Sequence, residues 1–402
     1  MSAQSHILAG RAAAAAPLES RLAGRIVAQD ESCRTRLLAI AAGLDDVIAL
    51  GRGDPDFHTP AHICEAAKAA IDANQHHYTP PHGMPALREA IARHLAERYG
   101  LDYGAGEIVV TAGVQESIML VMLGLVEAGD EVLITSPRFT TYDTAVRLCG
   151  GIPVPVPTSE AEDFALNVAE IEARITPRTK ALILVSPNNP TGAVTPPPVI
   201  ARIAELAVRR DLVVVSDEIY AAIIYEGAEH LSIATLPGMR ERTITLNGFS
   251  KSYAMTGWRV GYLAGPEAFV SALTEPRHTL SINACTVSQH AALAALTGPQ
   301  EPVAEMMAAY AERRAFLMKA FGDLGFGYGF PGGAFYLYVN VGSRDEKASA
   351  FCERLLREAR VLVFPGTLFG DPQDRHIRVS FLQPLPRIET AMARIRDAFG
   401  ER

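Results

Sequence analysis

The chain has 402 residues, of which 49% are hydrophobic and 20% charged, so it can form one large globular domain or two to three smaller ones. Its 45 acidic and 37 basic residues give a formal net charge of −8, which favours neither nucleic acid nor an anionic membrane surface as a partner. No stretch approaches the ~20 apolar residues that span a bilayer, and five scattered cysteines without a C-x-x-C pair indicate a reducing cytoplasm rather than a disulfide framework or a common zinc site.

The first part of the chain precedes any regular alternation of elements. Residues 1–17 are expected to form a loose arm, and apolar residues recur at helical spacing from Leu18 to Leu44. A short strand is predicted at Val47–Leu50, followed by a stretch with the Gly, Asp and Pro content of a turn. Thr59 is expected to cap a helix that begins at Pro60.

Two adjacent histidines, His76 and His77, lie in the next loop, ahead of a predicted helix at Pro85–Tyr99. Adjacent histidines can bind a metal, but no Cys, Asp or Glu stands at ligand spacing near them. We therefore predict no metal site and interpret this stretch as a connecting loop.

From Glu107 onward, short apolar strands alternate with helices. The expected strands are 108–111, 131–135, 152–156, 181–185, 212–216 and 243–246, and the expected helices are about 114–126, 139–149, 167–174 and 196–210. Strands that are apolar on both faces and joined by helical crossovers are typical of a mostly parallel sheet covered by helices. The sequence thus predicts an α/β fold, in which ligands bind beyond the carboxyl ends of the strands.

The pattern changes after a strand predicted at Val260–Leu263. Longer helices are expected at about 266–278, 285–297 and 300–321, followed by strands at 334–341, 361–364 and 377–381 and a final helix. We interpret the change as a second, smaller α+β domain formed by the N- and C-terminal parts of the chain. The predicted division is 1–57 for the arm and part of the small domain, 58–298 for the large domain and 299–402 for the rest of the small domain.

Small or polar residues follow several of the predicted strands. Gly113 and Val114 form a strand-to-helix turn, whose unpaired N–H groups favour an anion. Phe139 follows the next strand, where it either stacks on a flat ring or belongs to the core. Asn189 lies in a rigid Asn-Asn-Pro-Thr-Gly turn, where its amide can donate to a ligand oxygen.

Asp217 comes directly after an apolar strand, where an unpaired carboxylate would be costly, so it needs a buried cation such as a protonated ring nitrogen. Tyr220, three residues further on, is within reach of the same ring. Lys251 supplies an amine that can condense with an aldehyde. Pyridoxal 5′-phosphate, which is flat and carries a phosphate, a ring nitrogen and an aldehyde, meets all of these requirements.

The motifs resemble those of one known family in their order and spacing. They are Ser-Pro-Asn-Asn-Pro-Thr-Gly at 186–192, Ser-Asp-Glu-Ile-Tyr at 216–220 and Ser-Lys-Ser-Tyr-Ala-Met-Thr-Gly-Trp-Arg-Val-Gly-Tyr at 250–262. They are similar to segments of the fold-type I, class I/II aminotransferases, the family that includes aspartate aminotransferases, from about Ile48 to the C-terminus. The resemblance implies a homodimeric pyridoxal-phosphate enzyme that moves an amino group between an α-amino acid and a 2-oxo acid by a ping-pong mechanism.

The resemblance also implies a role for each matching residue around the ring. Lys251 would be the Schiff-base lysine and later the proton carrier, and Asp217 would pair with the ring nitrogen. Tyr220 and Asn189 would bond the 3-oxygen of the ring, and Phe139 would stack on it.

The same resemblance assigns the phosphate to the backbone of Gly113 and Val114 and to Arg259. Tyr78 would reach the phosphate from the neighbouring subunit.

Two residues match the family's substrate contacts, and two positions depart from its phosphate site. Arg378 would bind the α-carboxylate of the substrate, and the backbone of Gly53 would approach the substrate. Gly248 stands where many relatives carry a serine, for which Ser250 could compensate. Relatives also carry a hydroxyl beside the phosphate-binding glycine, and here Ala112 and Val114 flank that glycine instead.

Other reactions use the same residues. A β-lyase, or another Cα-carbanion enzyme such as a cyclopropane-forming synthase, is an alternative of the same fold. A non-catalytic pyridoxal-binding regulator is a remote alternative, because it needs a basic DNA-binding module for which we expect no room ahead of this domain. The intact Lys251, Asp217 and Arg378 also argue for turnover.

The substrate itself is left open by the sequence. Arg277 or His278 lies roughly where acid-specific relatives carry a cation for a distal carboxylate. Phe335 and Tyr336 could line an apolar pocket or belong to the core.

Overall fold

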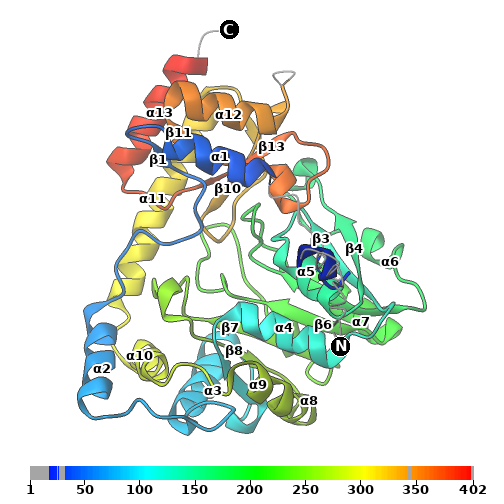
Figure 1. Cartoon of the computed structure of the whole chain (residues 1–402). Helices are drawn as coiled ribbons and strands as arrows, with labels where there is room; N and C mark the ends of the chain where they lie inside the picture. The colour runs from blue at the N-terminus through cyan, green and yellow to red at the C-terminus, as the bar shows by residue number, and fades with distance from the viewer. Residues whose placement is uncertain (1–17, 25, 27–31, 343–345, 400–402) are drawn as a thin grey trace, which may run out of the picture.

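The computed structural model describes residues 18–24, 26, 32–342 and 346–399 (Figure 1). The predicted arm at 1–17 lies outside the described residues, as do residues 27–31 of the predicted helix at 18–44. The remainder of that helix is a 3₁₀ turn, η1 (Leu18–Arg21), and a helix, α1 (Ser32–Ala42). A continuous helix from Leu18 is therefore wrong, since residues 22–24 are not helical.

The large sheet, counted over the described residues, has seven strands in the order β2-β8-β7-β6-β5-β3-β4. They are β2 (Ile108–Thr111), β3 (Glu131–Ser136), β4 (Ile152–Pro157), β5 (Thr179–Val185), β6 (Val213–Asp217), β7 (Thr243–Gly248) and β8 (Gly261–Ala264). Neighbours from β4 to β7 are parallel, and only β8 runs antiparallel to β7 and β2 within this sheet. The predicted α/β fold with a mostly parallel sheet is confirmed.

Helices cover both faces of the large sheet because its central strands are apolar on both sides. On β3 and β5, Ile134 and Ile183 pack in the core under α4 and α5, and their neighbours Leu133 and Leu182 pack in the core under α6 and α7. The helices are α2 (Ala61–Asp72), α3 (Pro85–Tyr99), α4 (Val114–Leu125), α5 (Thr141–Leu148), α6 (Val168–Glu172), α7 (Pro197–Arg210), α8 (Glu267–Ala272), α9 (Thr274–Ser281) and α10 (Thr286–Thr297). The helix predicted at 266–278 is thus two helices that meet at Leu273.

A second, smaller group of elements lies at the top of Figure 1, reached through the long helix α11 (Glu301–Asp323). Its sheet has the order β12-β13-β10-β9, and β1 pairs with β11 beside it. The strands are β1 (Ile48–Ala49), β9 (Gly327–Tyr328), β10 (Tyr336–Asn340), β11 (Val361–Leu362), β12 (Phe364–Pro365) and β13 (His376–Ser380), and the helices are α12 (Ala348–Ala359) and α13 (Leu385–Phe399).

The N-terminal and C-terminal parts of the chain share one hydrophobic core in this smaller group. Leu37 of α1 and Ile48 of β1 pack with Phe335, Val361 and Ile388. This core is what a small domain built from both ends of the chain requires. The boundaries predicted at 57/58 and 298/299 stay a prediction.

The turn before α2 is built differently from its prediction. The helix begins at Ala61 with Pro60 at its N-cap position, and no side chain caps it. The Thr59 hydroxyl instead donates to the carbonyl of Ala254 at 2.7 Å and accepts from the Trp258 indole at 3.0 Å. Thr59 therefore ties this turn to the segment after Lys251, and the predicted cap is wrong.

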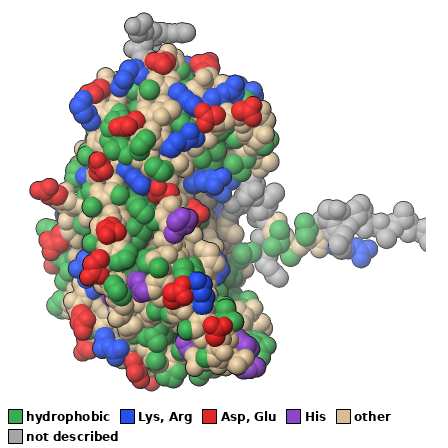
Figure 2. Space-filling view, turned by 90° about the vertical axis from the view of Figure 1, so that its left-hand side faces the viewer, with side chains coloured by type: hydrophobic (Ala, Val, Ile, Leu, Met, Phe, Trp, Pro, Cys, Tyr) green, Lys and Arg blue, Asp and Glu red, His purple; other side chains and the backbone are tan. Residues whose placement is uncertain are grey.

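On one face of the molecule, charges of both signs are dispersed (Figure 2). On the face in Figure 2, Lys and Arg side chains are interspersed with Asp and Glu side chains. The acidic excess of the chain is therefore not gathered into one patch on this face. Among the described helices, none combines the length and the apolar character needed to cross a membrane.

Candidate active site

A cavity of about 530 Å³ lies at the carboxyl edge of the large sheet, where the small sheet approaches it. Most of the residues predicted for the site line this one cavity: Gly53, Val114, Phe139, Asn189, Asp217, Tyr220, Ser250, Lys251, Arg259 and Arg378. Segments that lie far apart in the sequence therefore meet as the strand-end argument predicts.

Asp217 ends β6 at the bottom of the cavity and is only 2% exposed. Its carboxylate accepts hydrogen bonds from the Tyr142 hydroxyl at 2.7 Å and from the Ile219 N–H at 3.1 Å. Burial raises the pKa of Asp217 to about 6, against the lowering effect of these two donors. A cationic group in the cavity would stabilise the charged form of this buried carboxylate.

Lys251 follows β7, and its ammonium nitrogen donates to the carbonyl oxygen of Gly53 at 2.6 Å. Burial lowers the pKa of Lys251 to about 8, and the positive charges of Arg378 and Arg259 act in the same direction. A lysine with that pKa has an appreciable neutral fraction near neutrality, which both a nucleophile and a general base need.

The first turn of α4 and the Arg259 side chain form one end of the cavity. Arg259 donates to the carbonyl oxygens of Thr256 and Ala112, at 2.9 and 3.2 Å. Gly113 has a φ of +86°, and a Cβ there would lie 2.5 Å from Nη2 of Arg259. A guanidinium is thus held against the N-terminus of a helix, where N–H groups without intrahelical partners favour an anion.

The departure at Gly248 has a packing reason. Gly248 pairs with Gly261 across β7 and β8, and a Cβ at 248 would lie 2.9 Å from the Gly261 Cα. A serine would not fit here without a shift of the backbone. Ser250 lines the cavity, as the predicted compensation requires.

Arg378 on β13 forms the opposite end and is 7% exposed. Its two terminal nitrogens donate to Oδ1 of Asn189 at 2.9 Å and to the carbonyl of Gly51 at 2.6 Å. The guanidinium carbon lies 4.6 Å from the ring centroid of Tyr336, and its buried Nε has no hydrogen-bond partner among the described residues. The fork is therefore fixed in place while it keeps donor capacity for a carboxylate.

A pair of tyrosines lies between the two ends. The hydroxyls of Tyr220 and Tyr336 are 3.1 Å apart. A Cβ at Gly53 would lie 2.6 Å from the Tyr336 hydroxyl, so a residue with a side chain would displace this pair. Because the Asn189 amide oxygen accepts from Arg378, its nitrogen is the group that can donate to a ligand.

Sequence reasoning missed Tyr142 and Arg34 and left the place of Tyr336 open, and the structure brings all three to the cavity. Tyr142 lies three residues after Phe139, close to the start of α5, and this spacing was the available signal for it. The sequence left open whether Tyr336 lines a pocket or belongs to the core, and the structure shows that it lines the cavity. Arg34 lies on α1, and no sequence signal connected that helix with the site.

The remaining candidates lie away from the cavity. Arg277 is 1% exposed and donates to the carbonyls of Pro81 and Ile282. Neither Arg277 nor His278 lines the cavity, which argues against a distal carboxylate contact within the same chain. Phe335 belongs to the hydrophobic core. Tyr78 is 80% exposed and does not line the cavity of its own chain.

The fold and the site together define a class of enzyme that holds a flat, anionic cofactor between a sheet-end aspartate and a lysine. Comparisons with known proteins are consistent with that class. Residues 45–395 match the model of the family described as aminotransferase class I and II. The chain is 40% identical to aromatic-amino-acid aminotransferase 2 of Thermococcus litoralis and 41% identical to the aspartate aminotransferase of Pyrococcus abyssi, in each case over 91% of this chain and 95% of the relative. The solved structure of Thermus thermophilus aspartate aminotransferase with maleate superposes with a TM-score of 0.88 at 37% identity, covering 94% of this chain and 99% of that one.

The chain belongs to the class I and II aminotransferase family, and it is a pyridoxal-phosphate-dependent aminotransferase. The cavity fits this cofactor on its own evidence. It offers a buried carboxylate whose charged form needs a cation, an amine with a lowered pKa and a guanidinium against a helix N-terminus. A ring nitrogen, an aldehyde and a phosphate are the complementary groups.

Proposed function

We propose that the enzyme exchanges an amino group between an α-amino acid and a 2-oxo acid in two half-reactions at one cavity, by a ping-pong mechanism. The observation that carries this proposal is the pair formed by Lys251 and Arg378. A lysine with a lowered pKa and a fixed guanidinium line the same cavity, so one substrate can meet both.

Pyridoxal phosphate, when bound, supplies an aldehyde that condenses with amines and a ring that accepts electrons from the substrate α-carbon. Asp217 would hold the proton of the ring nitrogen, and Tyr220 and Asn189 would donate toward the 3-oxygen. Phe139 would pack on the ring face. Gly113, Val114, Ser250 and Arg259 would hold the phosphate.

The substrate is oriented from the other end of the cavity. The Arg378 fork would bind the α-carboxylate, and this contact would fix the direction of the Cα–H bond toward the Lys251 amine. Lys251 would take the proton from the α-carbon and return it to the cofactor side, which is the proton movement of transamination. The Lys251 amine donates to the carbonyl of Gly53 at 2.6 Å, which directs it toward the substrate end of the cavity.

We further propose acidic amino acids as the preferred donors. Arg34 and Arg52 also line the cavity, and neither makes an ion pair within the described residues. The Arg34 guanidinium lies 5.7 Å over the ring of Phe364, close to the Arg378 end. Unpaired arginines at the substrate end favour a second carboxylate, and relatives named as aspartate aminotransferases support this choice.

Aromatic amino acids are the second candidate. Ile118, Tyr336 and Phe364 give the cavity an apolar wall, and one relative is named as an aromatic-amino-acid aminotransferase.

The test is a screen of amino donors with the purified holoenzyme, against pyruvate and 2-oxoglutarate as acceptors. Aspartate or glutamate should give the highest kcat/KM, and Arg34→Ala should lower kcat/KM for these donors about tenfold while changing that for phenylalanine less than twofold. Equal losses for acidic and aromatic donors would refute the role of Arg34. A clear preference for aromatic donors in the unaltered enzyme would favour the second candidate.

We also propose a cytoplasmic homodimer, in which Tyr78 reaches the phosphate of the partner's site. Tyr78, Ile71 and Leu280 are large apolar side chains that are each more than half exposed. The loop after α2 is joined to α10 by the bond from the Thr286 hydroxyl to the carbonyl of His77. An interface would cover these side chains, and sedimentation of the holoenzyme would measure the mass.

A further inference from the structure

His376 lies at the seam between the two sheets, two residues before Arg378 on β13. Residues at i and i+2 of a strand share one face, so both side chains belong to the face of the small sheet that carries Tyr338 and Asn340 on β10. The register pairs Asn340 with His376 and Tyr338 with Arg378. His376 and Arg378 are therefore two residues apart on one face of a single strand.

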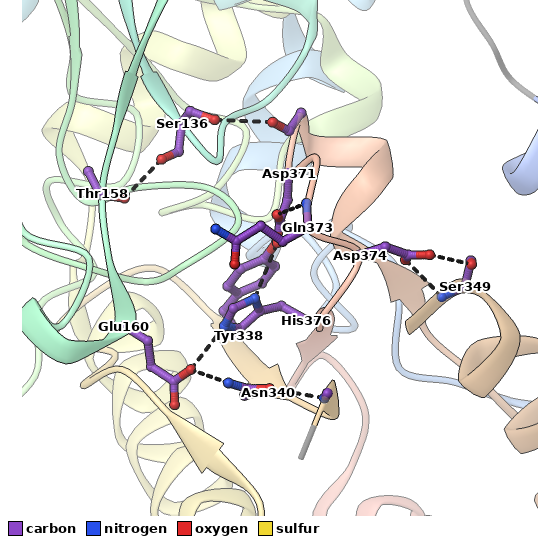
Figure 3. Close-up of polar contacts among 12 residues, drawn as sticks. Ser136, Thr158, Glu160, Tyr338, Asn340, Ser349, Asp371, Gln373, Asp374 and His376 are labelled. Atoms are coloured by element: carbon purple, nitrogen blue, oxygen red, sulfur yellow. Dashed lines mark hydrogen bonds and ion pairs between the residues drawn. The ribbon is translucent and has the colours of Figure 1, made fainter. Parts of the chain in front are cut away.

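Both ring nitrogens of His376 meet carboxylates (Figure 3). Nδ1 lies 3.2 Å from Oδ2 of Asp371, and Nε2 lies 3.0 Å from Oε2 of Glu160. A neutral imidazole carries one N–H and an imidazolium carries two, so only the imidazolium can donate to both partners. A doubly protonated ring would therefore bridge the two carboxylates.

The ring is fixed by its neighbours as well as by its hydrogen bonds. Tyr338 stacks on His376 with a centroid distance of 4.7 Å and an interplanar angle of 6°, and Phe164 meets its edge at 5.5 Å. The Tyr338 hydroxyl also donates to Asp371 at 3.0 Å. Burial raises the pKa of Asp371, but the bonds from His376, the Gln373 N–H and Tyr338 outweigh it and keep this pKa below its ordinary value.

Glu160 connects the ring to the large sheet. It belongs to η3 (Glu160–Glu162), which follows β4, and it also accepts from the Asn340 amide at 2.6 Å. The neighbouring Thr158 hydroxyl donates to the carbonyl of Ser136 at the end of β3, as Figure 3 shows. The segment that holds Glu160 is therefore tied to the strand end that leads to Phe139.

We propose that His376, as an imidazolium bridging Glu160 and Asp371, is a positioning residue that sets Arg378 relative to the cofactor end of the cavity. The inference rests on the proposed carboxylate-binding role of Arg378. His376 itself does not line the cavity. The bridge acts by holding β13 against the large sheet, so that the substrate carboxylate is bound at the correct distance from Lys251.

Glu160→Gln tests the bridge without removing the ring. The amide keeps the size of the side chain and its contact with Asn340, and Glu160 is 28% exposed, so folding should be retained. We expect KM for the amino donor to rise roughly threefold to tenfold at pH 7, with kcat and the Kd for pyridoxal phosphate changed less than twofold. The matched control is Glu162→Gln on the same 3₁₀ turn, whose carboxylate accepts from Ser159 on its own segment, and it should change none of these values.

His376→Gln tests the ring itself. The groups that face the ring are Glu160, Asp371 and Tyr338, and Arg375 lines the same seam. We expect His376→Gln to raise KM for the amino donor as Glu160→Gln does, with kcat and the Kd for pyridoxal phosphate changed less than twofold.

Three outcomes have distinct meanings. A KM for Glu160→Gln equal to that of Glu162→Gln at pH 7 would overturn the proposal. Parallel increases in KM and in the Kd for the cofactor would also overturn it, because they would indicate general loosening. If Arg378→Ala fails to raise KM, the proposed role of Arg378 fails on its own, independently of the bridge.

Discussion

The two ends of the cavity are built on different principles. The cofactor end comes from residues at or just beyond the ends of strands of one sheet, with Asp217 as the last residue of β6 and Lys251 three residues after β7. The substrate end is assembled from α1, the turn at Gly51, β10 and β13, where α1 packs in the core of the smaller group and Arg378 of β13 donates to Gly51. The first end depends on the strand ends of one sheet, whereas the second depends on how the smaller group of elements packs against that sheet.

The two guanidinium groups show the same difference. Arg259 is exposed and donates to backbone carbonyls, so its charge is available to a phosphate that comes from solvent. Arg378 is buried, donates to Asn189 and Gly51 and packs on Tyr336 and Phe369. A preorganised guanidinium binds best to a carboxylate of matching geometry, whereas an exposed guanidinium attracts any negatively charged group.

Lys251→Ala should have the largest effect and tests the cofactor end. Loss of the amine removes both the covalent anchor and the proton carrier, so kcat should fall by at least about a thousandfold. Steady-state transamination and the absorbance of the bound cofactor measure the two losses. Ser252→Ala, one residue further on, is the control and should retain activity; near-normal turnover of Lys251→Ala would contradict the assignment.

Arg378→Ala should have the next largest effect and tests the substrate end. Removal of two charge-assisted hydrogen bonds should raise KM for the amino donor roughly a hundredfold, while the Kd for pyridoxal phosphate changes less than threefold. Arg378→Lys should fall between, because a lysine keeps the charge without the planar fork. Equal losses of substrate and cofactor affinity would remove the distinction between the two ends.

The pH dependence of Lys251 sharpens the contrast within the cofactor end. Because burial lowers its pKa to about 8, its acylation rate in the cofactor-free protein should rise about tenfold per pH unit below pH 8 and level off above it. Lys68 is the internal control, since its hydrogen bond to Glu65 raises its pKa and should keep it less reactive over the same range. Mass spectrometry of acylated peptides gives both rates, and identical profiles would refute the burial effect.

The cofactor end could be predicted from the sequence because local signals place it. A strand that ends in Asp217, or a turn that ends in Gly113, fixes a residue at the sheet edge without knowledge of any distant partner. Reliance on local signals also explains the wrong prediction for Thr59. Thr59 had the sequence of a helix cap, but its hydroxyl bonds to Ala254, almost two hundred positions away.

The substrate end could not be predicted in full because its residues are brought together by packing between distant parts of the chain. Arg34 sits on a helix with no motif, and it reaches the cavity because α1 packs with the small-sheet core. Arg277 had the expected position along the chain, but its buried contacts with Pro81 and Ile282 hold it elsewhere. Spacing along the sequence does not report which sheet a helix will cover.

Tyr142→Phe should have the smallest effect and tests how finely the cofactor end is tuned. Its hydroxyl donates to Asp217 at 2.7 Å and lowers the pKa of that carboxyl, which burial otherwise raises to about 6. Without this donor the charged form of Asp217 is less favoured, so kcat should fall about threefold to tenfold at neutral pH. The loss should grow as the pH falls, because protonation of Asp217 begins at a higher pH in the variant.

The control for this last change is Tyr225→Phe, which removes a buried hydroxyl that donates to the carbonyl of Ala334 at 2.7 Å. Tyr225 belongs to the small-sheet core, so its loss should lower stability without moving the acid limb of the kcat profile. If both variants move that limb equally, the shift reports general loosening rather than the bond to Asp217. If only Tyr142→Phe moves it, the carboxylate at the end of β6 is set by a residue that follows β3, and the cofactor end depends on two strand ends acting together.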